Sequence, residues 1–424
     1  MLLKGQKKRR AVARLFCVSD FLCNVRSVYN AYKKEKQAER AARKGAGMRF
    51  IHTADWHLGK LFYGQYLTEE QEWVLRERFL PLVDDVRPDV ILLAGDVYDR
   101  SVPPAEAVDL FDEMISEIVG VRHIPFLVIS GNHDSSGRLS FGSRLLAAEG
   151  LYMCGDLTRT VRPIILSDAY GDVAFAPMPY AETADVRRAL GDETIRDHEA
   201  AMRALSEHLL AAIPARVRRI AAAHDFIAGG APSDSERPLS IGGADVISAD
   251  IFAPYHYTAL GHLHGPQKAG GSDTIRYSGS LMKYSFGEAR QKKGVVVGDM
   301  DGQGRVTTAF YPLEPRRDVR VVSGTFDELM TRQDDAPDDF LMADLTDEGP
   351  VIDAMARLRQ KYPRVMALRT RSFVREDSGE RAAAGARVDV MDMLDIFSQE
   401  FQGRSLTEEE KEFLDGVRKE AEQA

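Results

Sequence analysis

The stretch IPFLVISGNHDSSGR, residues 124–138, decides how the fold is interpreted. Its apolar, β-branched part, residues 124–129, is typical of a buried strand, and the Gly131-Asn132 pair after it is typical of a turn. Asn132, His133 and Asp134 therefore stand at the carboxyl end of a strand, where α/β proteins place their chemistry. A Gly-Asn pair after a strand is most often only a turn, so the function depends on what else reaches this edge.

The order of strand, loop and helix is repeated from Met48 onward. A strand at 49–53 ends in Asp55-x-His57, and a strand at 89–93 ends in Gly95-Asp96. Helices are expected from the capping-box pattern that begins at Thr68, and from 104 to 119. Strands that alternate with helices imply a mainly parallel, covered sheet. The carboxyl ends of parallel strands lie at one edge, so these loops are expected to converge.

Two later strands also end in histidine. Residues 219–223 lead into His224, and residues 257–260 lead into Gly261-His262-Leu263-His264. The repetition predicts a pair of packed sheets that both contribute ligands. Near residue 270 the sequence pattern changes to short strands and turns, which predicts a smaller α+β domain over 270–372. The polar residues 373–387 are typical of a linker.

Residues 388–424 predict a helical tail, whose second helix begins with a capping-box pattern, Thr407-x-x-Glu410. Each helix has a large apolar face. Such faces either pack on the protein itself or dock onto a partner, as amphipathic helices beyond a linker commonly do. The residues in question are Leu394, Phe397, Phe401, Phe413 and Leu414.

Charge is distributed unevenly along the chain. Residues 1–47 hold thirteen Lys and Arg against three Asp and Glu, a net charge of +10, so residues 48–424 carry −19 of the total −9. This basic extension is a disordered tail that touches nucleic acid, a partner-binding arm, or sequence from upstream of the true start. We favour the last, because Met48 stands directly before the first strand, and expect a chain that begins at Met48 to keep full activity.

The acidic body argues against broad, unspecific adhesion to nucleic acid, although a local basic surface is compatible with it. Six basic residues are candidates either for DNA contact or for solvated surface charge. They are Arg138, Arg144, Lys283, Arg290, Lys292 and Lys293.

Length and cysteine content set further bounds. No apolar run reaches the roughly 20 residues that span a bilayer. The three cysteines, Cys17, Cys23 and Cys154, form no disulfide or zinc pattern, which predicts a cytoplasmic protein.

Seven candidate metal ligands gather at the strand ends: Asp55, His57, Asp96, Asn132, His224, His262 and His264. Each histidine alone is more often a core or loop residue than a ligand. Two cations about 3.5 to 4 Å apart need one bridging carboxylate and further ligands, and the set supplies them. We expect Asp96 to bridge, with Asp55, His57 and His264 at one metal and the others at the second. Oxygen and nitrogen ligands without thiolate favour manganese, with iron and zinc as alternatives.

A dinuclear centre of this kind holds an activated hydroxide and clamps a phosphate for in-line displacement. His133 follows the expected ligand Asn132 and is not itself needed as a ligand, so we expect it to protonate the leaving group. Asp134 is expected to orient the His133 ring and to hold it protonated.

These motifs, in this order, resemble those of the calcineurin-like metallophosphoesterases. The longer strings HTADWHLGK, LLAGDVYDRSVPP, SGNHDSSGRL, LGHLHGPQ and YSGSLMKYSFGEARQKKGV are more narrowly similar to the bacterial SbcD family of nuclease subunits. The resemblance covers about residues 48–310. It implies a four-layer α-β-β-α sandwich, a capping domain, and C-terminal helices that grip the coiled coil of a partner.

The resemblance also implies a function. Members of that family are manganese-dependent DNA nucleases, exonucleolytic on duplex ends and endonucleolytic on hairpins and single strands. The implied partner is an SbcC-type coiled-coil ATPase, and the implied assembly is a homodimer within a heterotetramer. Because residues 48–424 are acidic, we expect that partner to supply most of the DNA grip. The implied processes are DNA repair, replication and recombination.

One position departs from the related archaeal and eukaryotic repair nucleases, which carry a histidine three residues after the bridging aspartate. This chain has Asp99 there, as bacterial members of the family do, and its role is open. Two rival functions remain. An enzyme for a small phosphodiester or a phosphoprotein has little need of a docking tail, and a non-catalytic scaffold is expected to lack ligands, of which none is missing.

Overall fold

The computed structural model describes residues 47–160, 162–233, 236 and 246–370, and in the tail residues 398, 404–407, 410–411 and 413–415. The chain divides into two compact units, Met1–Arg371 and Ser372–Ala424. The predicted basic extension up to residue 46 and the predicted linker at 373–387 lie outside the described residues.

The first central sheet contains the strand that precedes the GNHD motif. Its order is β16 (Val306–Pro312), β15 (Gly294–Met300), β1 (Met48–Thr53), β4 (Val90–Ala94), β5 (Phe126–Ile129) and β6 (Leu151–Cys154). The last four strands are parallel, with Phe50 opposite Val90 and Ile91 opposite Phe126. The strands β15 and β16 are antiparallel to their neighbours. The loops after β1, β4 and β5 therefore leave the same edge.

The second central sheet is also mainly parallel. Its order is β13 (Gln267–Lys268), β14 (Ile275–Tyr277), β12 (Tyr257–Gly261), β9 (Arg218–His224), β8 (Gly171–Met178) and β7 (Ile164–Asp168). The strands β8, β9, β12 and β14 are parallel, and Gly261 pairs with His224 at the carboxyl ends of β12 and β9. The edge strands β7 and β13 are antiparallel.

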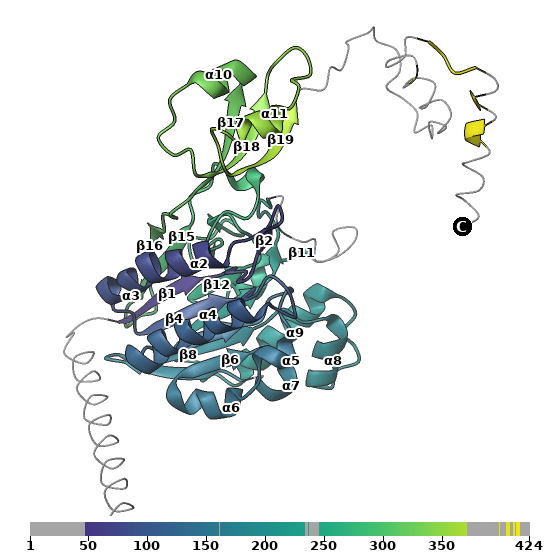
Figure 1. The fold of residues 1–424 in the computed structure, drawn as a ribbon. Coiled ribbons are helices and arrows are strands. Elements are labelled where there is room, and N and C mark those ends of the chain that lie inside the picture. The colour runs from purple at the N-terminus through teal and green to yellow at the C-terminus, as the bar shows by residue number, and fades with distance from the viewer. Residues whose placement is uncertain are drawn as a thin grey trace, which may run out of the picture. The chain divides into compact units, whose positions relative to one another are not determined.

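Helices cover the outer face of each sheet, as Figure 1 shows. Those on the first sheet are α2 (Thr68–Val74), a π-helical turn at Leu75–Phe79, α3 (Leu80–Val86), α4 (Ala105–Ile115) and a second π-helical turn at Ser116–Val121. Those on the second sheet are α8 (Thr183–Leu190) and α9 (His198–Ala211). The layers are therefore α-β-β-α, which confirms the predicted fold class.

Alternation along β1 and β4 explains the layers. Ile51 and Leu93 face the helices in one apolar core, whereas Phe50 and Leu92 face the second sheet in another. Tyr257 joins the core between the sheets from the opposite side. Strands that are apolar on both faces are expected in a sheet covered on both sides.

The predicted start of the smaller domain at residue 270 is wrong. The strands β14, β15 and β16 belong to the two central sheets, so the sandwich continues to Pro312. Met300 of β15 pairs with Met48 of β1. Pairing between strands so distant in sequence leaves no local pattern. The boundary was therefore placed too early, at the point where the local pattern changes to short strands and turns.

The smaller domain contains the three parallel strands β17 (Val319–Gly324), β18 (Phe340–Leu345) and β19 (Val365–Thr370). Its helices are α10 (Phe326–Thr331) and α11 (Ala354–Leu358), and a Thr325–Glu328 capping box opens the first. Glu70 of α2, which is buried, accepts a hydrogen bond from Arg316 Nη2 at 2.7 Å. This ion pair ties the segment before β17 to the sandwich.

The remaining elements are short. They are β2 (Leu61–Phe62), β3 (Gln65–Tyr66), β10 (Phe226–Ile227), β11 (Val246–Ile247), α5 (Ser136–Leu139), α6 (Ser143–Leu146), α7 (Leu157–Thr160), and 3-10 turns at Ala147–Glu149, Ala249–Phe252 and Phe286–Glu288. Across the described ranges, no helix combines the length and the apolar character needed to cross a membrane.

Two capping-box predictions have different outcomes. In the tail, the backbone N–H of Thr407 donates to Glu410 Oε2 at 2.9 Å, and that of Glu410 donates to Thr407 Oγ1 at 3.3 Å, so the predicted box is confirmed. At α2 the prediction is wrong, because the N-cap is Leu67 and makes no side-chain cap. Gln71, the expected partner of Thr68, is used elsewhere.

Candidate metal centre

Main-chain hydrogen bonds join the loop that follows β1 to the loop that follows β4. The backbone N–H of Asp55 donates to the carbonyl oxygen of Gly95 at 3.1 Å, and that of His57 donates to the carbonyl oxygen of Asp96 at 2.9 Å. Asp55, His57 and Asp96 have φ angles of 51°, 44° and 48°, and His262 has 101°. Positive φ is uncommon for residues with a Cβ, and such strain gathers at functional sites.

Two glycines permit the close approach of these loops. A Cβ on Gly131 would lie 2.1 Å from Oδ1 of Asp96, and one on Gly95 would lie 2.1 Å from Nδ1 of His224. No side chain fits at either distance. Gly131 is thus required by the close approach of Asp96, and Gly95 is required by the close approach of His224.

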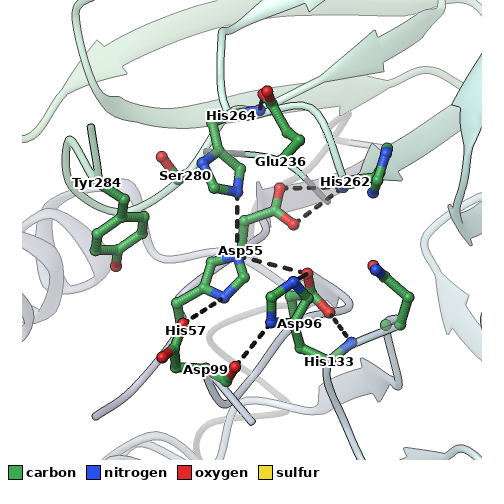
Figure 2. A network of polar contacts seen from close by, with 12 residues as sticks. Asp55, His57, Asp96, Asp99, His133, Glu236, His262, His264, Ser280 and Tyr284 are labelled. Carbon is green, nitrogen blue, oxygen red and sulfur yellow. Dashed lines mark hydrogen bonds and ion pairs between the residues drawn. The ribbon is translucent and has the colours of Figure 1, made fainter. Parts of the chain in front are cut away.

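The structure brings the seven predicted ligands together, and Figure 2 shows Asp55, His57, Asp96, His262 and His264 among them. His57 Nε2 lies 3.0 Å from His264 Nε2 and 3.4 Å from Asp96 Oδ2. His224 Nε2 lies 3.5 Å from the same Asp96 oxygen and 3.0 Å from Asn132 Oδ1. Asn132 is half-buried, and the other six are buried. One oxygen of Asp96 therefore lies between a histidine from each sheet, which is the position of a bridging carboxylate.

Asp55 and His262 complete the cluster. The backbone N–H of His262 donates to Asp55 Oδ1 at 3.0 Å, and Asp55 Oδ1 lies 3.8 Å from His224 Nδ1. The ring of His262 stands 5.5 Å, centroid to centroid, from that of His224. Ligand atoms of Asp55, His57 and His264 lie within 4.8 Å of one another, as do those of Asp55, Asp96 and His224.

The donor set fits divalent cations. His224 Nδ1 faces the carbonyl oxygen of Ala94 at 2.9 Å, so Nδ1 carries the hydrogen and Nε2 presents a lone pair. That lone pair faces Asn132 Oδ1 and an oxygen of Asp96, which are acceptors as well. Lone pairs that converge in this way need a cation between them. The residues therefore offer a donor set that suits divalent metal ions.

The electrostatics of the buried groups agree with this assignment. Burial, strengthened by the neighbouring charge of Asp96, raises the pKa of Asp55 well above its ordinary value. Burial lowers the pKa of His57, and it lowers that of His262 to about 3. Burial alone would raise the pKa of Asp96, but the imidazoles of His224 and His133 outweigh it and lower that pKa. The neutral imidazoles of His57 and His262 are ready metal ligands, whereas a metal ion has to displace a proton from Asp55.

His133 lies at the rim of the cluster. Its Nδ1 is 2.7 Å from the carbonyl oxygen of Asp99, and its Nε2 is 4.0 Å from Asp96 Oδ2. Its backbone N–H donates to Asp96 Oδ1 at 2.9 Å. The ring of His133 therefore lies outside the group of candidate ligands, with Nε2 on the side of Asp96.

The expected role of Asp134 in orienting that ring is wrong. Both oxygens of Asp134 are engaged by main-chain N–H groups: Gly131 at 2.9 Å, and Val97 and Tyr98 at 3.0 Å each. Asp134 therefore joins the GNHD loop to the loop after β4, and the carbonyl oxygen of Asp99 holds the ring of His133. Burial raises the pKa of Asp134 to about 7.

Several residues that position the site were missed by the sequence analysis. Gln71 Nε2 donates to the carbonyl oxygens of Trp56 at 2.9 Å and His57 at 2.8 Å, and Gln71 Oε1 accepts from the N–H of Gly59 at 3.0 Å. Tyr284 donates its hydroxyl hydrogen to the carbonyl oxygen of Trp56. Helix α2 thereby holds the Asp55–His57 loop.

A buried ion pair lies behind His264. Glu288 Oε1 is 3.2 Å from His264 Nδ1, and Glu288 Oε2 is 2.5 Å from Lys293 Nζ. Lys293 Nζ also donates to the carbonyl oxygen of His264 at 2.7 Å. The string YSFGEARQKKGV contains both residues, but local sequence offers no signal that it packs against the site.

The six basic candidates divide into two groups. Lys293 is 5% exposed, and Lys283 Nζ is bonded to Asp318 and to the carbonyl oxygen of Ala289 at 2.8 Å each. Both ammonium groups are bonded to partners within the protein, so the prediction of Lys283 and Lys293 as DNA contacts is wrong. The remaining four are not buried: Arg138, Arg144, Arg290 and Lys292.

The predicted docking residues are only partly described. Phe413 is 71% exposed, and Leu414 is half-buried. Leu394, Phe397 and Phe401 lie outside the described residues.

Comparison with known proteins places the fold and its metal cluster in one class. The chain belongs to the calcineurin-like phosphoesterase family, whose family model matches residues 48–266. A second family model, described as the Type 5 capsule protein repressor C-terminal domain, matches residues 315–404.

Within that class, a curated relative is the SbcD component of nuclease SbcCD from Staphylococcus epidermidis. It is 35% identical over 323 residues, which are 76% of this chain and 85% of the relative. The predicted resemblance to the SbcD family is thereby confirmed.

Two solved structures were also matched. A Thermus thermophilus protein has a TM-score of 0.36 at 14% identity, and the match covers 62% of this chain and 99% of that protein. A dimetal phosphatase from Danio rerio has a TM-score of 0.35 at 11% identity, and the match covers 63% of this chain and 99% of the phosphatase.

Proposed function

We propose that the protein is a dinuclear-metal DNA nuclease, exonucleolytic on duplex ends and endonucleolytic on hairpins and single strands. The observation that carries the proposal is the approach of His57 and His224 to one oxygen of Asp96, at 3.4 and 3.5 Å. The name of the relative, a component of nuclease SbcCD, supports a nucleic acid as the substrate.

In this proposal Asp96 would be shared by the two metal ions, Asp55, His57 and His264 would hold one of them, and Asn132, His224 and His262 would hold the other. Manganese is the proposed metal, because a mixed set of oxygen and nitrogen ligands without thiolate suits it. When bound, the metal pair supplies an activated water for in-line attack and clamps the phosphate.

His133 is the proposed proton donor to the leaving oxygen. Its Nδ1 is held by the carbonyl oxygen of Asp99, so Nε2 is the atom that faces the reaction. That nitrogen lies 4.0 Å from Asp96 Oδ2, close enough to reach a phosphate held at the centre.

The proposed partner is an SbcC-type coiled-coil ATPase, docked on the tail that contains the exposed Phe413. Support comes from the name of the relative, which is part of SbcCD, and from the second family match, which extends to residue 404. Arg138, Arg144 and Lys292 are the proposed DNA contacts. The proposed setting is DNA repair, replication and recombination in the cytoplasm.

Digestion of end-labelled duplex and hairpin DNA with Mn²⁺ tests the proposal. We expect cleavage by the unmodified chain and loss of at least about 10²-fold in Asp96→Ala, because the shared ligand is removed. The exposed Asp109→Ala is the matched control and should cleave normally. A chromogenic phosphodiester is assayed in parallel.

Cleavage of the chromogenic ester alone, also after addition of the ATPase partner, would contradict the DNA claim and favour an enzyme for small phosphodiesters or phosphoproteins. Absence of any cleavage with metal bound would favour a scaffold.

A further inference from the structure

The inference begins with the Nδ1 atoms of the ligand histidines. His224 Nδ1 faces the carbonyl oxygen of Ala94 at 2.9 Å, and His264 Nδ1 faces Glu288 Oε1 at 3.2 Å. An acceptor at Nδ1 fixes the hydrogen there and leaves Nε2 as the nitrogen with a lone pair. In both residues Nε2 points into the cluster. The acceptor thus sets the tautomer and the direction of each ring.

His57 differs from these two. Its Nε2 faces His264 and Asp96, but its Nδ1 is buried and has no hydrogen-bond partner among the described residues. A carboxylate oxygen, Oδ1 of Asp99, lies 3.7 Å away. That distance is slightly too long for a hydrogen bond, so a small movement of the side chain would complete the pattern of the other two histidines.

Asp99 is held in place by three contacts. Its N–H donates to the carbonyl oxygen of Leu58 at 3.2 Å, and its Oδ1 accepts from Lys60 Nζ at 2.8 Å. Its own carbonyl oxygen faces His133 Nδ1 at 2.7 Å. One residue therefore touches the proposed proton donor through its main chain and faces a proposed metal ligand through its side chain. Figure 2 shows Asp99 beside both rings.

We propose that Asp99 is a positioning residue that couples His57 to His133. With metal at His57 Nε2, the Asp99 carboxylate accepts the Nδ1–H of His57 and fixes that ring, while the Asp99 carbonyl oxygen fixes the ring of His133. This inference rests on the proposed function, since it assumes that His57 binds a metal ion.

The competing explanation is that Asp99 serves only its ion pair with Lys60, in which the side chains of Lys60 and Asp99 are 15% and 14% exposed. Two substitutions separate these explanations. Asp99→Asn loses the charge but keeps an oxygen that accepts from Nδ1–H. Lys60→Met loses the ion pair but keeps the carboxylate.

The test is titration of the metal-free full chain with Mn²⁺, followed by calorimetry and by electron paramagnetic resonance. We expect Asp99→Ala to weaken binding of one of the two ions by about 10- to 100-fold. Asp99→Asn and Lys60→Met should stay within about 3-fold of the unmodified chain, so Asn is the rescuing variant. Unchanged binding by Asp99→Ala, or equal weakening by Asp99→Ala and Lys60→Met, would overturn the proposal.

A second measurement holds if Asp99→Ala does not fold. In the zinc-loaded unmodified chain, the Nδ1 proton of His57 should exchange slowly with solvent and resonate downfield in proton NMR, and it should move upfield in Asp99→Asn. A rapidly exchanging proton in the unmodified chain would sink the inference.

Failure of the inference can be told from failure of the proposed function. If the unmodified chain binds no metal, the proposed function fails. If it binds two ions and Asp99→Ala binds them equally well, the inference alone fails.

Discussion

The rings of His57 and His133 lie 4.7 Å apart, centroid to centroid, yet their nitrogen atoms have different contacts. His57 directs Nε2 at the cluster, where a second imidazole and a carboxylate meet it. His133 stands outside that group, with Nδ1 fixed by a main-chain oxygen. A main-chain carbonyl accepts a hydrogen bond from either the neutral or the charged imidazole, which suits a group that gives and regains a proton.

Substitution of His133 separates metal binding from turnover. We expect His133→Ala to bind Mn²⁺ as the unmodified chain does and to cut DNA about 10² to 10⁴ times more slowly, since a proton donor contributes about that factor. Calorimetric titration and single-turnover cleavage measure the two quantities. Loss of metal binding in this variant would show that His133 is a ligand.

Metal binding should depend on pH through Asp55. The pKa of Asp55 is raised, so at low pH a proton competes with the metal for that carboxylate, and raising the pH removes the competitor. His262, with a pKa of about 3, is already neutral and adds no dependence near neutral pH. We therefore expect affinity for Mn²⁺ to rise with pH over the range in which the chain stays folded.

Calorimetry in buffers of different ionisation enthalpy counts the protons released. More should be released near the acid end of that range than near its alkaline end, and Asp55→Asn should bind weakly without that trend. Affinity that is independent of pH would contradict the assignment.

At the scale of elements, the site depends on which strands end together and on which helix supports their loops. Gln71 of α2 makes hydrogen bonds to three main-chain groups of the loop after β1. Its side chain is completely buried. A helix that covers the sheet thereby also shapes the loop that presents Asp55 and His57.

Replacement of Gln71 by Met keeps the volume and removes these bonds. Three buried main-chain groups then lack partners, at a cost of about 1–3 kcal/mol each at most. We expect Gln71→Met to lower the melting temperature and to weaken Mn²⁺ binding. Glu69→Met, at an exposed position of the same helix, is the matched control and should change neither. Normal metal binding by Gln71→Met would mean that the loop holds its shape without this helix.

The sequence was sufficient for the strand ends and insufficient for their supports. Asp55, Asp96 and His224 were predictable because buried strands and their terminal loops leave a local pattern, and parallel strands end at one edge. The roles of Glu288 and Lys293 were not, because they reach His264 through a tertiary contact. The same limit explains the misplaced domain boundary.

At the scale of the molecule, an apolar patch, formed by Phe141 and Leu145, follows the GNHD loop in the sequence. Phe141 is 82% exposed and Leu145 is 81% exposed, on and just before helix α6. Exposed apolar groups of this size commonly mark contact surfaces. The patch is our candidate for the surface that would form the homodimer that the resemblance to the SbcD family implies.

Two charges on this patch should abolish self-association. We expect Phe141→Asp with Leu145→Asp to be monomeric by light scattering where the unmodified chain is dimeric, with Mn²⁺ binding unchanged. The pair Glu149→Lys and Glu207→Lys is the control. A dimer that persists in the charged variant would place the contact on another surface.

Finally, the candidate ligands come from both central sheets: Asp55, His57, Asp96 and Asn132 follow strands of the first, and His224, His262 and His264 end or follow strands of the second. Cations held among them would therefore link the two halves of the sandwich. A ligand that binds only the folded state raises its stability. Loss of the metal ions would then shorten the lifetime of the protein as well as abolish its activity, because a less stable fold is degraded faster by proteases. The supply of metal in the cell would thereby govern how much of the enzyme exists.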